Sequence, residues 1–148
     1  MDILFYHLTE TRVDEALPAL LEKCLERSWR VVVQTISADR CAAIDGLLWT
    51  YRQDSFLPHG TDADEAAAAQ PVLLTAGPDN ANSASVRFLI DGAQPPELEG
   101  YQRIVFMFDG HDDEQVQAAR QHWKRLKADG NTLSYWQQNQ DGRWEKKA

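Results

Sequence analysis

The stretch RVVVQTI, residues 30–36, decides the fold class that the sequence predicts. Its β-branched residues run almost without interruption, which is typical of a strand covered on both faces. Upstream of it, apolar residues recur at helical spacing from Val13 to Leu25, and a short apolar run from Ile3 to Leu8 comes before that. Strand, helix and strand in this order predict a parallel crossover unit.

A second helix is expected directly after this strand. Ser37 is its predicted N-cap, and the helix should end before the break at residues 58–60. The first helix has two candidate caps, Thr11 and Asp14. The second helix should pack against the sheet through an apolar stripe of three residues, Cys41, Ile44 and Leu48.

Three further strands are predicted in the middle of the chain. PVLLT, residues 71–75, is one of them, and the runs VRFLIDG and RIVFMFDG, residues 86–92 and 103–110, both end in Asp-Gly. The shared ending predicts two buried strands that each leave the sheet through a turn. The intervening stretches 61–70 and 77–85 are low in complexity or rich in turn residues, which favours surface connections.

The C-terminal part predicts a helix from Asp112 to Ala128, with an acidic first turn and Gly130 just beyond its end. Residues 132–147 then predict either a hairpin or a strand followed by a tail. The chain as a whole, residues 1–148, is therefore expected to form one α/β domain, a mostly parallel sheet flanked by helices.

The composition limits which partners and which cellular location the sequence predicts. The chain has 148 residues, of which 43% are hydrophobic, and a formal net charge of -8, which argues against binding to duplex DNA or to an anionic membrane. Its two cysteines, Cys24 and Cys41, lie among apolar positions, as expected of buried thiols in a reducing cytosol. Because it has neither a signal-like N-terminus nor a long apolar run, we expect a soluble cytoplasmic protein.

Motifs for cofactors and metals are missing from the sequence. It contains neither GxGxxG nor GxxxxGK[ST], and the first connection from strand to helix, Thr9 to Asp14, has no glycine. The fold is thus expected to be Rossmann-like without a nucleotide-binding glycine loop. No histidines occur at HExxH spacing and no CxxC is present, so we expect neither a cofactor nor a metal.

Two aspartates leave an enzyme as an alternative. Asp91 and Asp109 follow predicted parallel strands, where α/β enzymes often hold magnesium or a nucleophile, and Asp112 and Asp113 are close by in sequence. Such a protein would use a divalent metal for phosphoryl chemistry. The competing interpretation is that Asp-Gly only turns the chain and that the later aspartates charge a helix N-terminus.

The last helix carries a row of cations. Arg120, Lys124 and Lys127 are spaced to share one face, and Trp123 lies at the border of the apolar stripe. This pattern also fits an ordinary solvated helix face whose cations favour the negative end of the helix dipole.

The second helix runs into an aromatic stretch. Trp49 is about 100° around the helix from Leu48, and Pro58 favours an extended backbone that brings Phe56 back towards Trp49. With Arg52 nearby, these rings predict a shallow apolar cup with a cationic rim, unless both rings are ordinary core residues. A further alternative is a module for single-stranded nucleic acid, in which Trp49 stacks on bases and the basic last helix contacts phosphates.

These features together resemble a known family. Leu48-Trp49, the run Asp-Ser-Phe-Leu-Pro-His at 54–59, Gln-Pro-Val at 70–72, and Ala119-Arg120-x-x-Trp123-Lys124 before Gly130-Asn131 resemble the chi subunit of bacterial DNA polymerase III. The resemblance implies a nucleotide-binding-like α/β fold without a nucleotide site and without catalysis. Chi proteins are accessory subunits of the clamp loader that pair with the psi subunit. They also hold the acidic C-terminal tail of single-stranded-DNA-binding protein, which ends in Ile-Pro-Phe.

The resemblance also implies roles for individual residues. The terminal phenylalanine of the tail would enter the cup of Trp49 and Phe56, and Arg120 would take the α-carboxylate through two parallel hydrogen bonds. Lys124 would meet the upstream aspartates, and Trp123 would line the site.

One position departs from the family pattern. Val116 lies one turn before Arg120, where a chi protein can carry a lysine. The resemblance therefore implies a less basic site here, in which Lys127 or Arg52 takes over the outer contacts.

Overall fold

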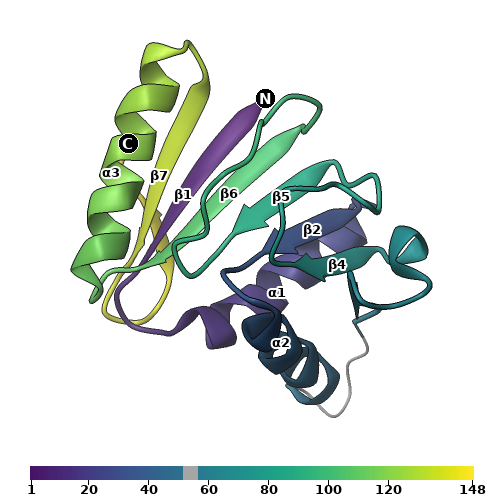
Figure 1. Ribbon diagram of the computed structural model, residues 1–148. Coiled ribbons are helices and arrows are strands. Elements are labelled where there is room, and N and C mark those ends of the chain that lie inside the picture. Colours follow the sequence, from purple (N-terminus) through teal and green to yellow (C-terminus); the bar gives the residue numbers. More distant parts are fainter. Residues whose placement is uncertain (52–56) are drawn as a thin grey trace.

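The computed structural model describes residues 1–51 and 57–148, and its strands form one eight-stranded sheet (Figure 1). The strands are β1 (Asp2–Leu8), β2 (Val31–Gln34), β3 (Gly60–Thr61), β4 (Val72–Thr75), β5 (Val86–Leu89), β6 (Arg103–Asp109), β7 (Thr132–Gln138) and β8 (Trp144–Lys146). They lie in the order β3-β4-β2-β5-β6-β1-β7-β8, and every pairing is parallel except that of β7 with β8. The predicted mostly parallel α/β sheet is confirmed, and residues 132–147 form the hairpin.

Helices cover both faces of the sheet (Figure 1). They are α1 (Val13–Glu26), α2 (Ala38–Thr50) and α3 (Asp113–Ala128), with one turn of 3-10 helix, η1 (Ala67–Ala69). Alternate side chains of a strand point to opposite faces, so Leu8 joins the core beneath α1 and α2, while Ile3 and Phe5 join the core beneath α3. The two helical layers are therefore on opposite sides of the sheet. No helix in the described part of the chain is long and apolar enough to cross a membrane.

The predicted stripe of α2 is confirmed, since Cys41, Ile44 and Leu48 are all buried. Its cap is confirmed too, because the Ser37 hydroxyl accepts a hydrogen bond from the backbone N–H of Arg40 at 3.1 Å. The stretch 61–70, expected to be only a connection, also contains η1 and the second residue of β3, which pairs with β4.

The predicted cap of α1 is wrong. Its N-cap is Arg12, and no side chain caps this end of the helix. Both candidates are engaged elsewhere: the Thr11 hydroxyl accepts from Gln138 Nε2 at 2.8 Å, and the Asp14 carboxylate pairs with the guanidinium of Arg40. The Thr11 hydroxyl and the Asp14 carboxylate, which the sequence suggested as caps, therefore form tertiary contacts instead.

The two Asp-Gly turns use their glycines differently. Asp91 and Gly92 have φ values of 58° and 79°, so the first turn needs a left-handed backbone that glycine adopts without strain. At Gly110 a Cβ would collide with the His7 ring and lie 2.7 Å from the Leu8 carbonyl oxygen. Here glycine allows a close approach between the end of β6 and the neighbouring strand β1.

An arginine is fully buried in the middle of β5. Arg87 has 0% exposure, and its guanidinium donates to the Gln34 side-chain oxygen at 2.7 Å and to the Tyr101 hydroxyl at 2.9 Å. It also donates to the carbonyl oxygens of Gly77 at 2.7 Å and Asp79 at 3.1 Å. These bonds tie the connection after β4 to the centre of the sheet.

Candidate functional site

The helix α3 presents an apolar side to the sheet and a cationic side to solvent. Ala119 and Leu126 are buried, and Trp123 is half-buried, with its ring 5.3 Å from Phe5 and 5.8 Å from Tyr135 in edge-to-face geometry. The sequence prediction that Trp123 lies at the border of the apolar stripe is confirmed. Its ring is therefore held rigidly while part of it remains open to a ligand.

Exposed cations stand beside this ring. Arg120, Lys124 and Lys127 are all exposed, as the spacing predicts. In the described part of the chain, none of the three forms an ion pair or a side-chain hydrogen bond. Their charges are consequently available to an anionic ligand.

Two residues that the sequence did not point to complete this surface. His7 Nδ1 lies 2.7 Å from the Tyr135 hydroxyl, and both residues are near Arg120. Burial lowers the pKa of His7, and the charge of Arg120 lowers it further. Burial raises the pKa of Tyr135, while Arg120 opposes that rise. We call Arg120, Trp123, Lys124, Tyr135 and His7 the α3 surface.

The α3 surface has the groups that a carboxylate next to an aromatic ring requires. The Arg120 guanidinium can donate two parallel hydrogen bonds to a carboxylate, and the Tyr135 hydroxyl supplies a neutral polar group beside it. Trp123 offers an aromatic wall at the same place. The only sequence signal for His7 and Tyr135 is strand alternation, which puts them on the same face as Phe5.

Trp49 lies away from the α3 surface, near the end of α2. Its side chain is 55% exposed at the end of α2, with its ring 4.8 Å from that of the buried His59. His59 in turn is held by Asp45, whose carboxylate oxygen is 3.1 Å from Nε2. Trp49 is therefore not a core residue.

Trp49 and Arg120 lie on helices that pack on opposite faces of the sheet. The helix α2 packs with α1 on one face of the sheet, and α3 packs on the other, so the described residues do not bring these two side chains together. The cause is topological, since successive crossovers placed the helices on opposite faces. Phe56 and Arg52, the other predicted members of the cup, lie outside the described residues.

The aspartates of the enzyme alternative line a small depression at the carboxyl ends of the strands, with a volume of about 190 Å³. Asp91 accepts hydrogen bonds from Thr35 Oγ1 at 2.6 Å and Arg40 Nε at 2.8 Å, and the same guanidinium binds Asp14. Arg40 thus neutralises the carboxylate that would otherwise attract a metal. Asp109 is exposed, and its carboxylate accepts from the backbone N–H of His111 at 2.8 Å.

Metal ligands do not cluster in the part of the chain that the structure describes. Among residues 1–51 and 57–148, no group of three or more His, Cys, Asp or Glu side chains is placed to hold a metal ion. The two cysteines, Cys24 and Cys41, are both buried free thiols. The arrangement at Asp91 is that of an ion-pair network.

The half-buried histidines predict a dependence of stability on pH. The pKa of His122 is lowered by burial first and then by Arg125, and its ring stacks on Phe106 at 5.3 Å. A lowered pKa means that the unfolded chain binds more protons, so this stabilisation is present above pH 6.5 and is lost as the pH falls towards the folded-state pKa. We expect the free energy of unfolding to fall from pH 7.5 to pH 5.5, and to fall less in His122→Gln.

Urea unfolding at several pH values would measure this. An equal pH slope in the wild type and in His122→Gln would contradict the assignment.

Comparison with known proteins gives the family. The family described as "DNA polymerase III chi subunit, HolC" matches residues 1–134. A protein of Rickettsia prowazekii (strain Madrid E), named "Probable DNA polymerase III subunit chi", is 31% identical over 111 residues, which cover 70% of this chain and 67% of that protein. The chain therefore belongs to the chi subunit family of DNA polymerase III, a family of DNA replication subunits.

Proposed function

We propose that this protein is a non-catalytic adaptor of the replisome. It binds the acidic C-terminal tail of single-stranded-DNA-binding protein and links it, through the psi subunit, to the clamp loader. The observation that carries the proposal is the α3 surface. There Arg120 and Lys124, which have no ion pair among residues 1–51 and 57–148, stand beside the aromatic wall of Trp123 on a chain of net charge -8. A replication subunit acts beside the chromosome, so a cytoplasmic location is part of the proposal.

The α3 surface would receive the tail from its C-terminus. Arg120 takes the α-carboxylate, the terminal phenylalanine packs against Trp123, and Tyr135 lies next to both. Lys124 and Lys127 follow along the same helix face and meet the upstream aspartates. Val116 is half-buried one turn before Arg120, so the basic row begins at the arginine.

The magnitudes suit a reversible tether. Burial of one phenyl ring contributes about 2–3 kcal/mol and an arginine-carboxylate pair about 1.5–3 kcal/mol, while ordering the flexible tail offsets part of both. Together these two contacts contribute no more than about 6 kcal/mol. The dissociation constant on the order of 1–20 μM that we expect therefore also requires the contacts of Lys124 and Lys127 with the upstream aspartates, and the binding should weaken with salt. Several tails on one tetrameric partner raise the effective strength without new contacts.

Trp49, with Phe56 and Arg52 after it in sequence, is proposed as a separate contact. Because Trp49 is exposed on the opposite face from α3, it would meet a different part of the tail or a second tail. Its contribution is then independent of the carboxylate at Arg120.

Calorimetric titration with a six-residue acidic peptide ending in Ile-Pro-Phe tests the proposal. The matched control is the same peptide with an amidated C-terminus, which removes the negative charge but keeps the ring. We expect micromolar binding for the free acid and at least a tenfold loss for the amide, about 1.4 kcal/mol or more. Equal binding of the two peptides, or none of either, would remove tail binding from the function of this chain.

A further inference from the structure

The face of the sheet opposite α3 carries a cluster of aromatic side chains over β1, β7 and β8. The ring of Tyr6 lies 6.4 Å from that of Trp136 in a stacked arrangement and 4.7 Å from that of Trp144 in an edge-to-face one. All three are half-buried. On this face α1 packs against β6, and aromatic rings cover the strands beyond it.

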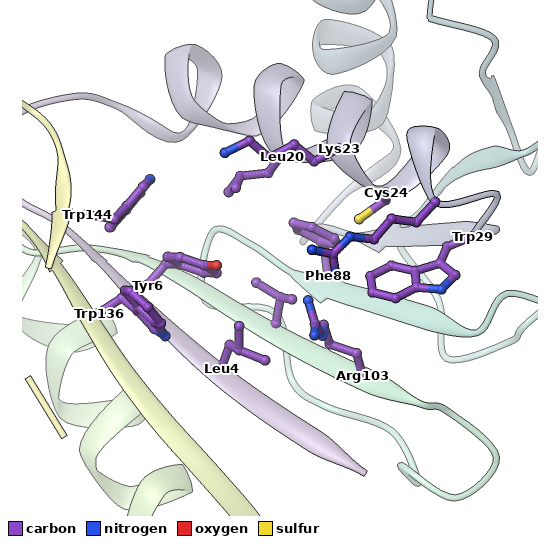
Figure 2. Close-up of a pocket in the computed structure, with 12 residues that line it drawn as sticks. Leu4, Tyr6, Leu20, Lys23, Cys24, Trp29, Phe88, Arg103, Trp136 and Trp144 are labelled. Atoms are coloured by element: carbon purple, nitrogen blue, oxygen red, sulfur yellow. The ribbon is translucent and has the colours of Figure 1, made fainter. Parts of the chain in front are cut away.

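Between this cluster and α1 is a pocket with a volume of about 270 Å³. Figure 2 shows side chains from α1 and from the strands pointing towards one another across it. Leu20 and Cys24 line it from the helix, and Leu4, Phe88 and Val105 line it from the sheet. Its walls are therefore apolar.

Cations surround one end of this pocket. The guanidinium carbons of Arg27 and Arg103 each lie 4.9 Å from the centroid of the Trp29 ring, and Lys23 is exposed nearby on α1. Stacking on an indole orients a guanidinium while leaving its N–H edge free for hydrogen bonds.

These rim cations have few ionic partners among the described residues. Arg103 has one loose pair with Asp2 at 3.8 Å, and Asp2 is itself 60% exposed. In the described residues Arg27 and Lys23 form no ion pair. On a chain of net charge -8, three weakly compensated cations around an apolar opening make a local site for a negatively charged partner.

We propose that this pocket, which we call the α1 pocket, is a second docking site, for a segment of a partner protein that presents a bulky apolar side chain next to carboxylates. Tryptophan, tyrosine and arginine, which line it, are the residue types that dominate protein-protein hot spots. Its volume is slightly below the roughly 300–1,000 Å³ of small-molecule sites, so one or two side chains fill it. The rim cations select acidic neighbours for those side chains.

The proposal is independent of tail binding at the α3 surface. The α1 pocket and α3 are on opposite faces of the sheet, and they share no lining residue. The inference therefore stands or falls on its own.

The tryptophans allow a direct test. The chain has five, of which Trp29, Trp136 and Trp144 line the α1 pocket, while Trp49 ends α2 and Trp123 belongs to the α3 surface. Indole N–H signals in ¹⁵N-correlated NMR thus report on each place separately. The probe is the blocked peptide Ac-Asp-Glu-Phe-Leu-Asp-NH2, which has no free C-terminal carboxylate. Its control is the same peptide with lysine at the three acidic positions.

We expect the acidic peptide to shift the signals of Trp29, Trp136 and Trp144, and the lysine peptide to leave them unchanged. The variant Lys23→Gln/Arg27→Gln, which changes two exposed side chains, should weaken binding about tenfold. Arg12→Gln/Arg125→Gln removes the same charge elsewhere on the surface and should bind as the wild type does. Arg120→Ala should also leave these shifts intact.

Three results would overturn the proposal. One is the absence of shifts at the three pocket tryptophans with the acidic peptide. Another is equal binding of the lysine peptide or of the Lys23→Gln/Arg27→Gln variant. The last is concentration-dependent dimerisation, measured by light scattering, that broadens the same three signals without peptide, because the occupant would then be a second copy of this chain.

Discussion

Arg87→Ala is expected to lower the free energy of unfolding by about 3–5 kcal/mol, a large part of the roughly 5–15 kcal/mol that holds an ordinary domain folded. The arginine is fully buried, and its loss leaves a cavity in the middle of β5. It also leaves the buried Gln34 side-chain oxygen and the buried Tyr101 hydroxyl without this donor. An unsatisfied buried acceptor costs more than the net worth of the bond it lost.

Urea denaturation followed by circular dichroism would measure the effect. The matched control is Arg125→Ala, an exposed arginine on α3, which should change stability by no more than about 0.5 kcal/mol. If Arg87→Ala proved as mild as the control, the buried guanidinium would contribute little to folding.

The sequence predicted the sheet better than it predicted the polar interior. Unbroken apolar runs mark β2, β4 and β6, because parallel strands buried on both faces need apolar residues at every position. Arg87 interrupts such a run. The local sequence does not predict that this arginine is buried, because its partners Gln34 and Tyr101 are 53 and 14 residues away. Contacts at this separation leave no local pattern.

The same limit applies to the candidate site. Helical spacing was sufficient to predict that Arg120, Lys124 and Lys127 share an exposed face and that Trp123 lies at its border. It did not reveal which strand residues lie opposite them, and so His7 and Tyr135 were missed.

Nor did spacing decide on which face of the sheet a helix lies. Trp49 was correctly expected at the edge of α2, but the spacing did not predict that α2 and α3 lie on opposite faces of the sheet. The spacing of residues in the sequence shows only which side of its own helix a residue lies on. The relation between two helices depends on the crossovers of the whole chain.

Arg120→Ala is expected to weaken binding of the Ile-Pro-Phe peptide by about 20-fold or more, equivalent to about 2 kcal/mol. The side chain is exposed on α3 and has no ion pair among the described residues, so its removal costs the fold little. It takes away the guanidinium that the α3 surface offers to the terminal carboxylate. Calorimetry with the free-acid and amidated peptides would measure both parts of this expectation.

The sharpest test combines the Arg120→Ala variant with amidation of the peptide C-terminus. If Arg120 binds the α-carboxylate, the variant should no longer distinguish the free acid from the amide, because each change removes the same interaction. Arg125→Ala, also exposed on α3, should keep the full preference for the acid, and so should Trp49→Ala, because Trp49 is on the opposite face from α3. A preference for the free acid that survived in Arg120→Ala would place the carboxylate at another cation, and Lys124 would then be the first to replace.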